Sequence, residues 1–424
     1  MGRLMRAAAP VVLALASGGC WPATGAGPDR RAYNDVEVSV TAATAPTLAE
    51  EWTATTAAGP RGVSSPVVSP AGLVHVTTES SVYGIDLVTG AIRWVEAPYA
   101  EVGGAIVDTQ MSVGPLPGDG DHLYVSILRG GTGWENAAFQ TVDGWWFSEF
   151  FGRQEGIRAA GTELRAAFST YSAVGSILRQ GLTTFGENVV DVAVTDHPGS
   201  ARFTVGTDLV FQAGSGLMAT GPGDGTEGVG LRAIPYSGGA SDCGAPGDAV
   251  FACPAWVVPL DGRTATTPVL SADGGTVYVG TDAGTVTAVA TATGAVLWSA
   301  PVGSAVAAPP ALAPDALLVP TTSGVLVALD PAGCGAATCA PSWSSVPGEP
   351  LLVQPGAATD VVVVGARDGT VAAYPTAGCG QPTCAPVWTV ATGSPITGAP
   401  AITRGRVLVG TADGRVIAFA PAAP

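Results

Sequence analysis

Apolar residues near the C-terminus recur in a short pattern that repeats at a step of 45 residues. Trp298, Trp343 and Trp388 are each one step apart. Between them, an apolar run, a glycine turn and an alternating apolar run ending in alanine recur as VYVGTDAGTVTA (277–288), LLVPTTSGVLVA (317–328), VVVGARDGTVAA (362–373) and VLVGTADGRVIA (407–418). Two apolar runs around a turn in which glycine supplies a positive φ predict a β-hairpin.

A period of 40 to 50 residues built from short β-rich runs is typical of β-propeller blades. One blade cannot bury both of its faces alone, so several must stack around an axis. The expected architecture is all-β, with one propeller domain over residues 48–424 and irregular, insertion-bearing blades at about 100–240. The residues expected to pack one blade on the next are Trp52, Trp94, Trp256, Trp298, Trp343 and Trp388.

These tryptophans, together with two irregular blades, give a count of eight blades, with seven as the alternative. The last unit, at about 395–420, has no tryptophan of its own. We therefore expect the strand around Trp52 to complete it, so that pairing of the N-terminal strand with the C-terminal blade closes the ring. Closure removes the open sheet edges that otherwise template aggregation.

The blade ends carry a second repeated motif. It is visible as Ile85-Asp86, Thr89-Gly90 and Trp94, and again as Thr293-Gly294 and Trp298. A further copy begins at Leu329-Asp330. In these residues the chain resembles the pyrroloquinoline-quinone-type β-propeller repeat family, which includes bacterial lipoproteins. The resemblance implies a propeller in which the tryptophan packs between blades, and it is specific for fold and weak for function.

The N-terminus has the features of an export signal over residues 1–20. Arg3 and Arg6 precede an apolar run that is too short to span a bilayer. Ser17-Gly18-Gly19-Cys20 is similar to a lipobox, in which Cys20 is lipidated and becomes the new N-terminus, although Ser17 stands where leucine is usual. Ordinary cleavage nearby is the alternative. Residues 21–47 are rich in Ala, Pro, Thr and Gly, which predicts a flexible linker.

Six further cysteines form three local pairs, each just before a blade-ending tryptophan. The pairs are Cys243 with Cys253, Cys334 with Cys339, and Cys379 with Cys384. In an exported chain this arrangement predicts disulfides that staple extended hairpin loops. Zinc is the rival interpretation, but metal sites seldom use two isolated cysteines without histidine.

Charge and composition restrict the partners. The formal net charge is −16, no basic cluster is visible and lysine is absent. Nucleic acid and anionic membrane both require a basic face, so neither is expected as a partner. We expect a monomer that touches the membrane through its lipid anchor only, either on the outer face of the cell membrane or in the periplasm.

The sequence offers little catalytic chemistry. Its three histidines, His75, His122 and His197, have no spacing that converges on a metal. No catalytic or metal-binding residue is assigned, and no cofactor is expected. The resemblance leaves pyrroloquinoline quinone with calcium as the alternative, because the family includes quinone-dependent dehydrogenases, but the adjacent cysteines typical of those enzymes are missing here.

Residues 134–151 depart most clearly from the repeat, because aromatic side chains are concentrated there. Trp134, Trp145, Trp146 and Phe150 are candidates for a partner-binding patch, since aromatic residues give rigid contact area. The alternative is that they fill the core of a divergent blade. The expected function is a non-enzymatic scaffold that binds an envelope protein or cell-wall component. A quinone-dependent periplasmic oxidoreductase and a glycan-binding module remain the alternatives.

Overall fold

The computed structural model describes residues 21, 25–26, 29–57, 59–97, 254–263 and 266–422, together with the strands between 105 and 235 and the turn at 141–144. The predicted export signal, Cys20, Cys243, Cys253, Trp145 and His197 lie outside the described residues. Apart from one short 3-10 turn, η1 (Ala45–Thr47), the regular elements in the described part are β-strands. None of its helices is long and apolar enough to cross a bilayer.

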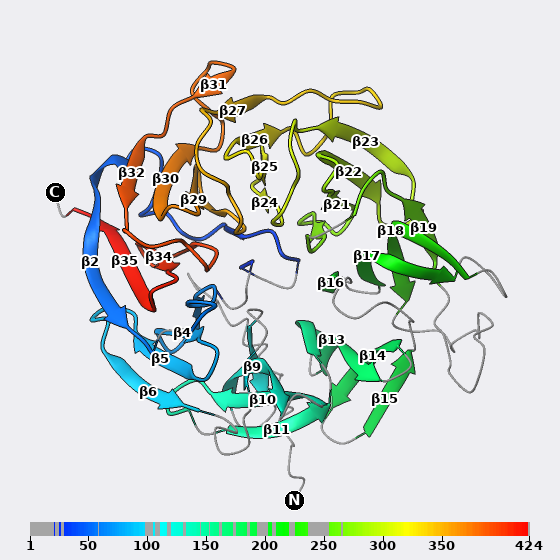
Figure 1. The fold of residues 1–424 in the computed structure, drawn as a ribbon, viewed down its shortest axis with the longest axis horizontal. Helices are drawn as coiled ribbons and strands as arrows, with labels where there is room; N and C mark the ends of the chain where they lie inside the picture. The colour runs from blue at the N-terminus through cyan, green and yellow to red at the C-terminus, as the bar shows by residue number, and fades with distance from the viewer. Residues whose placement is uncertain are drawn as a thin grey trace, which may run out of the picture.

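The described strands form eight sheets, five with four strands and three with five. Figure 1 shows the sheets arranged around a common centre. Sheets 1 to 4 contain β3 (Val67–Val68), β4 (Leu73–Thr77), β5 (Val82–Asp86) and β6 (Ile92–Glu96); β7 (Ala105–Ile106), β8 (Ser112–Leu116), β9 (Gly120–Arg129), β10 (Gly133–Gln140) and β11 (Trp146–Phe151); β12 (Arg153–Ala160), β13 (Glu163–Ser172), β14 (Gly175–Thr184) and β15 (Glu187–Val192); and β16 (Arg202–Val205), β17 (Leu209–Ala219), β18 (Gly225–Pro235) and β19 (Trp256–Pro259).

The repeats recognised in the sequence form the other four sheets. Sheets 5 to 8 contain β20 (Val269–Leu270), β21 (Thr276–Gly280), β22 (Thr285–Ala290) and β23 (Val296–Pro301); β24 (Ala311–Leu312), β25 (Leu317–Pro320), β26 (Leu326–Leu329), β27 (Trp343–Ser345) and β31 (Thr383–Cys384); β1 (Tyr33–Asn34), β28 (Gly356–Ala358), β29 (Val361–Gly365), β30 (Thr370–Pro375) and β32 (Trp388–Ala391); and β33 (Ala401–Thr403), β34 (Arg406–Gly410), β35 (Arg415–Pro421) and β2 (Leu48–Thr55).

The last sheet combines the two ends of the chain. Strand β2 pairs antiparallel with β35, from Leu48 opposite Pro421 to Thr55 opposite Arg415. The sequence predicted this pairing from the missing tryptophan of the last unit. Every residue of β29 is buried, as expected for a strand covered on both faces by neighbouring sheets.

The turns of each sheet alternate between its two ends. In sheet 1, the turn between the first and second strands and the turn between the third and fourth lie together, because Leu87 N donates to Gly72 O. In sheet 5, Thr291 N donates to Gly275 O in the same way. We call this side of the molecule face A. The opposite side, which carries the turns between second and third strands, is face B.

Candidate functional site

The axis of the molecule, where a propeller can enclose a ligand, is lined by the first strands of the sheets. Trp21 lies against one of them and is 1% exposed. It forms an antiparallel bridge with Val68, whose N–H donates to Trp21 O at 2.7 Å. Strand β3 runs toward face A, so the antiparallel chain at Trp21 enters from face A and heads toward face B.

Residues 29–34 then run along four consecutive sheets. Leu270 N donates to Asp29 O, Leu312 N to Arg31 O and Ala357 N to Ala32 O, at 2.7 to 2.9 Å. β1 pairs in parallel with β28, and the Asn34 side-chain amide donates to Ile402 O at 2.9 Å. The segment therefore uses backbone donors of the innermost strands of sheets 5, 6 and 7 and a carbonyl of sheet 8.

Hydrogen bonds and unusual backbone angles fix the start of this stretch. Ala32 N donates to Gly25 O at 2.8 Å, and Ala26, Arg30 and Ala32 all have positive φ. Gln354 fixes the turn from the side, because its amide donates to both Arg30 O and Pro310 O. Such φ values are uncommon outside glycine and persist where surrounding contacts hold the backbone.

The flexible linker expected over residues 21–47 is wrong for the part that the structure describes. Its composition lacks an apolar period, so no strand could be predicted there. The segment is ordered by backbone hydrogen bonds to strands that are distant in the sequence, and short β pairings of this kind require no apolar period. We call the described residues between 21 and 34 the axial segment.

Glu37 fixes the chain where it leaves the axis at face A. Its carboxylate accepts hydrogen bonds from the backbone N–H groups of Ser39, Val40 and Gly405. Its backbone carbonyl accepts from the Thr359 hydroxyl. Glu37 is buried, and a buried carboxylate is tolerable when several donors surround it. Glu37 thus ties the N-terminal segment to the face-A turn of sheet 7 through its backbone carbonyl and to that of sheet 8 through its carboxylate.

The blade-packing tryptophans predicted from the sequence lie at the contacts between sheets. The indole N–H donates to a backbone carbonyl of the next sheet in five of the six: Trp52 to Leu87, Trp94 to Thr141, Trp256 to Thr291, Trp343 to Thr376 and Trp388 to Leu48. In four of these five the ring lies against a turn glycine with positive φ: Gly90 for Trp52, Gly144 for Trp94, Gly294 for Trp256 and Gly378 for Trp343. A side chain at such a glycine would overlap the ring.

Trp298 departs from this pattern. Its indole N–H is buried and has no hydrogen-bond partner. The Tyr278 hydroxyl donates to Pro331 O at 3.0 Å, in the turn that also carries Gly333 against the Trp298 ring. Tyr278 has therefore taken an acceptor in the turn that Trp298 faces. Burial raises the pKa of Tyr278 to about 12, so the hydroxyl remains a donor.

The cysteine loops have a role that the sequence did not indicate. Cys334–Cys339 and Cys379–Cys384 are bonded. The first loop reaches back to sheet 5, where Ser299 N donates to Ala337 O and Cys339 N donates to Ser299 O. The second adds β31 in parallel to β27 of sheet 6. Each loop covers the outer edge strand of the preceding sheet, an edge that would otherwise be open to pairing.

Two kinds of contact between sheets follow. Short-turn seams are those of Trp52 with Gly90, Trp94 with Gly144 and Trp256 with Gly294, where the next sheet contributes a tight turn. Disulfide seams are those of Trp298 with Gly333 and Trp343 with Gly378, where a bonded loop also covers the edge.

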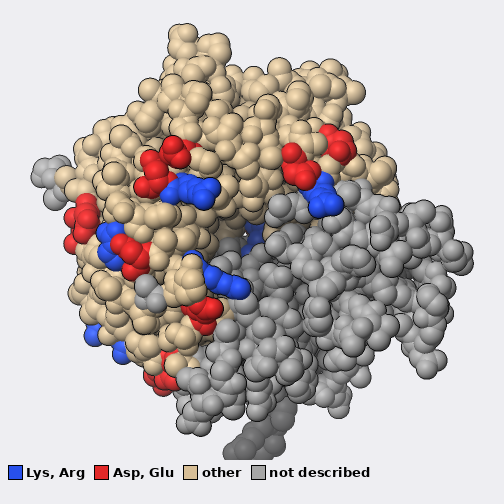
Figure 2. All heavy atoms as spheres, in the orientation of Figure 1, with Lys and Arg blue, Asp and Glu red and all other residues tan. Residues whose placement is uncertain are grey.

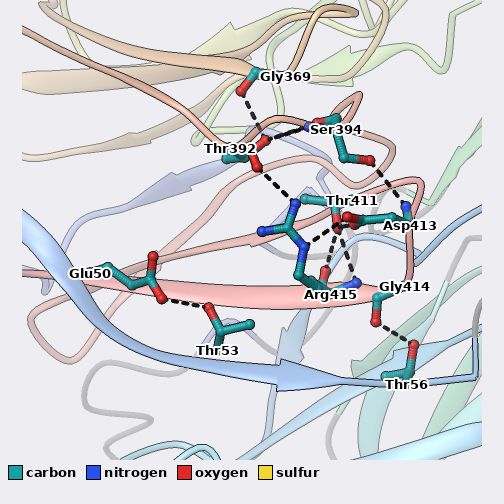
Figure 3. A network of polar contacts seen from close by, with 10 residues as sticks. All are labelled: Glu50, Thr53, Thr56, Gly369, Thr392, Ser394, Thr411, Asp413, Gly414 and Arg415. Atoms are coloured by element: carbon teal, nitrogen blue, oxygen red, sulfur yellow. Dashed lines mark hydrogen bonds and ion pairs between the residues drawn. The ribbon is translucent and has the colours of Figure 1, made fainter.

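A polar network on face B joins sheet 8 to sheet 7. The Arg415 guanidinium pairs with Asp413 and donates to Thr392 O at 2.7 Å (Figure 3). The Thr392 hydroxyl donates to Gly369 O or Ser394 O. Burial would raise the pKa of Asp413, but hydrogen bonds from Thr411 and Arg415 lower it overall. All of these groups have partners within the fold, which indicates a structural network.

The aromatic stretch 134–151 lies mainly on β10 and β11. The two strands pair, with Asn136 opposite Phe150 and Phe139 opposite Trp146. Phe139 is fully buried and stacks on Trp94 with ring centroids 6.5 Å apart, so it belongs to the core. Backbone alone is described for Trp134, Trp146 and Phe150. The partner patch as a whole remains a prediction.

Two of the three histidines are buried in strands, as expected for structural residues. His75 in β4 packs on Trp94 at a centroid distance of 5.5 Å. Both of its ring nitrogens are buried without a hydrogen-bond partner, and burial lowers its pKa to about 3. The residue is therefore neutral at physiological pH and acts as a packing group.

The described residues can be compared with what a site for pyrroloquinoline quinone and calcium would require. Within the described part, no group of three or more His, Cys, Asp or Glu is placed to hold a metal ion. The described axis carries the axial segment on strands of sheets 1 and 5 to 8. These residues do not fit a quinone with its calcium ion at the axis.

Figure 2 shows one face of the molecule with a hollow near its centre and arginine atoms at the floor of that hollow. Acidic and arginine side chains lie around it in small mixed groups, without a broad basic area.

Comparison with known proteins supports the fold. The family model described as outer membrane protein assembly factor BamB matches residues 254–374 and 333–423. The predicted resemblance to the quinone-type propeller repeat family is thereby confirmed for the C-terminal repeats. A search of curated proteins finds no significant match.

Several solved structures are similar over most of the chain. Quinohemoprotein alcohol dehydrogenase from Comamonas testosteroni is 16% identical, with a TM-score of 0.67 and coverage of 96% of this chain and 81% of that one. BamB from Moraxella catarrhalis is 14% identical, with a TM-score of 0.55 and coverage of 88% and 97%. A europium-containing methanol dehydrogenase is 12% identical, with a TM-score of 0.65 and coverage of 95% and 98%. At these identities the likeness establishes a propeller-like fold and no activity.

Proposed function

We propose that this chain is an exported, lipid-anchored, eight-bladed β-propeller that acts as a non-enzymatic scaffold for an envelope protein. Eight sheets in the described part and the pairing of β2 with β35 support the blade count and the closed ring. The family description, which names an assembly factor of the outer membrane, supports an envelope partner.

The axial segment is the observation that carries the proposal. An enzyme of this shape needs room at the axis for a cofactor and a substrate. Here the chain's own backbone occupies donors of the inner strands of sheets 5, 6 and 7, and Trp21 is buried against sheet 1. The proposed scaffold therefore uses the outer surface of the ring, and the proposal includes no bound cofactor or catalytic residue.

For the partner surface, we propose the aromatic stretch, with Trp134, Trp145, Trp146 and Phe150 as its anchors. Phe139 of the same stretch is already used in the core, so the residues outside that contact are the candidates. Aromatic anchors at the centre of an interface contribute most of its binding free energy.

Pull-down of the tagged full chain from native membrane fractions tests this function. We expect one envelope protein to co-purify, and Trp145→Ala with Trp146→Ala to reduce its recovery at least tenfold, since anchor truncation costs about 2 kcal/mol or more. Leu352→Ala, an exposed residue on face B, is the matched control and should leave recovery unchanged.

Three results would contradict the proposal. Equal recovery of the envelope protein with the tryptophan double variant and with Leu352→Ala would show that the two tryptophans are not anchors of the interface. A bound chromophore with dye reduction after addition of quinone and calcium would identify an oxidoreductase instead. Saturable retention on cell-wall polysaccharide, without a protein partner, would identify a glycan-binding module.

A further inference from the structure

Face A combines the point where the N-terminus leaves the axis with a set of exposed aliphatic side chains. Val36 and Val38 flank Glu37, whose contacts with Thr359 and Gly405 place this loop on face A. Val88 lies in the face-A turn of sheet 1, and Val142 in that of sheet 2. Their exposed fractions are 51, 73, 63 and 68% in that order.

These valines are among the most exposed large apolar residues of the described part. Ile92, Val296 and Leu297 lie at the starts of β6 and β23, directly after face-A turns, and are also exposed. On face B, Leu352 lies in a loop held by Leu351 N donating to Thr321 O. Val95 and Val346 also lie toward face B, at the ends of β6 and β27. Of the ten exposed aliphatic residues of the described part, seven lie on face A or directly after its turns and three lie toward face B.

The direction of the chain at Trp21 connects this face to the N-terminus. Because Trp21 runs antiparallel to β3, the chain direction at this bridge is from face A toward face B. Trp21, which follows Cys20 directly in the sequence, is buried in the fold. A lipid on Cys20 would have no spacer with which to hold the propeller away from a bilayer.

We infer that face A rests directly on a phospholipid bilayer, with the exposed valines in the headgroup region and face B turned to the aqueous side. This inference rests on the lipid anchoring proposed above. The acyl chains supply most of the membrane affinity, and the valines fix the orientation by moving apolar area out of water. The partner would accordingly be bound at the rim, where β11 forms the outer strand of sheet 2.

Face A also carries exposed carboxylates, including Asp35, Asp143 and Asp360. They are repelled by anionic headgroups, and the repulsion is strongest at low salt. The surface therefore fits a zwitterionic bilayer better than an anionic one, which agrees with the net charge of −16.

Hydrogen exchange of the membrane-extracted full chain, reconstituted in phosphatidylcholine vesicles, tests the orientation. We expect slowed exchange in the face-A turns at 35–40, 87–91 and 141–144 relative to full-length Cys20→Ala with the same vesicles. The face-B turns at 281–284 and 411–414 should be unchanged. Replacing half of the lipid with phosphatidylglycerol at low salt should weaken the protection.

A charge substitution separates direct contact from tethering. Val36→Asp with Val38→Asp should reduce the face-A protection about tenfold, because two exposed valines lose their apolar contact with the bilayer. Leu352→Asp on face B is the matched control and should have no effect.

Mass spectrometry of the N-terminal peptide distinguishes the hypothesis that Cys20 is lipidated from the hypothesis that face A rests on the bilayer. Absence of a lipid on Cys20 would overturn the anchoring and the orientation together. A lipidated chain with protection on face B, or with no protection in pure lipid vesicles, would overturn the orientation alone; in the second case face A is left to a protein partner.

Discussion

The short-turn seams and the disulfide seams place the same indole in two different surroundings. In the short-turn seam of Trp94, the ring rests on Gly144 and its N–H donates to Thr141 O, with β6 forming the outer strand of sheet 1. In the disulfide seam of Trp343, the ring rests on Gly378, its N–H donates to Thr376 O, and β31 pairs along β27. The indole contact is common to both, and edge protection is added by the longer loop.

Packing of the indole and covering of the outer sheet edge are therefore separable in this fold. A tight turn suffices to seat the indole. Covering the edge needs a longer loop, and a disulfide reduces the entropy cost of ordering it. The seams differ again at one strand position, where His75 faces Trp94 and Tyr278 faces Trp298.

Removal of the indole should give the largest effect. Trp94→Ala is expected to lower the free energy of unfolding by about 3–5 kcal/mol, because a buried aromatic ring leaves a cavity. Chemical denaturation of the mature chain measures it. Trp343→Ala should cost a similar amount, whereas a much smaller cost there would mean that the disulfide loop substitutes for the indole.

The next largest effect should come from a methyl group added beside the same ring. A Cβ on Gly84 would lie 2.2 Å from Trp94 Cε2, so Gly84→Ala should destabilise by about 3 kcal/mol through overpacking. The equivalent residue opposite Trp298 is already Ala288. Ala288→Gly should cost only about 1 kcal/mol by denaturation. Equal costs at the two positions would contradict the difference between the seams.

Removal of a disulfide should have an intermediate effect confined to its own seam. Cys379→Ser with Cys384→Ser should cost about 2 kcal/mol, the loop-entropy value for so short a loop. Limited proteolysis should then cut the loop around Gln381 first. Cys334→Ser with Cys339→Ser is the matched variant, and cleavage elsewhere in either would show that the loop does not depend on its bond.

The histidine of the short-turn seam should make stability depend on pH. The pKa of His75 is lowered from 6.5 to about 3 in the fold, so the unfolded chain binds its proton first as the pH falls. The contribution of neutral His75 to the free energy of unfolding is complete above pH 6.5. It is lost between pH 6.5 and pH 3, at about 1.4 kcal/mol per pH unit. His75→Leu should flatten the melting temperature between pH 7 and 5.5; an unchanged slope would contradict this.

The tyrosine of the disulfide seam should give the smallest effect. Tyr278→Phe removes the hydrogen bond to Pro331 O and frees that carbonyl, while the Trp298 N–H lacks a partner. The loss should stay below about 1 kcal/mol in thermal denaturation, because a typical hydrogen bond contributes that much net. A larger loss would show that Trp298 cannot use the freed carbonyl.

Much of the repeat could be predicted from local signals. The 45-residue step carries Gly333 to Gly378, Cys334 to Cys379 and Trp343 to Trp388, and these positions are structurally equivalent. Hairpin turns, disulfide partners and seam tryptophans depend on residues close in the sequence, so their spacing is informative. Phe139 shows the limit, because the same aromatic stretch fits a core and a binding surface equally well from sequence.

The blade unit can be inferred from local sequence, because apolar alternation, turn glycines and the recurring indole each lie within one repeat. The position of the axial segment, its attachment through Glu37 and the edges that the cysteine loops cover are visible only in the folded chain. Those contacts are made by backbone groups and single side chains across hundreds of residues. They leave no period in the chain, and they form only once the sheets are in place.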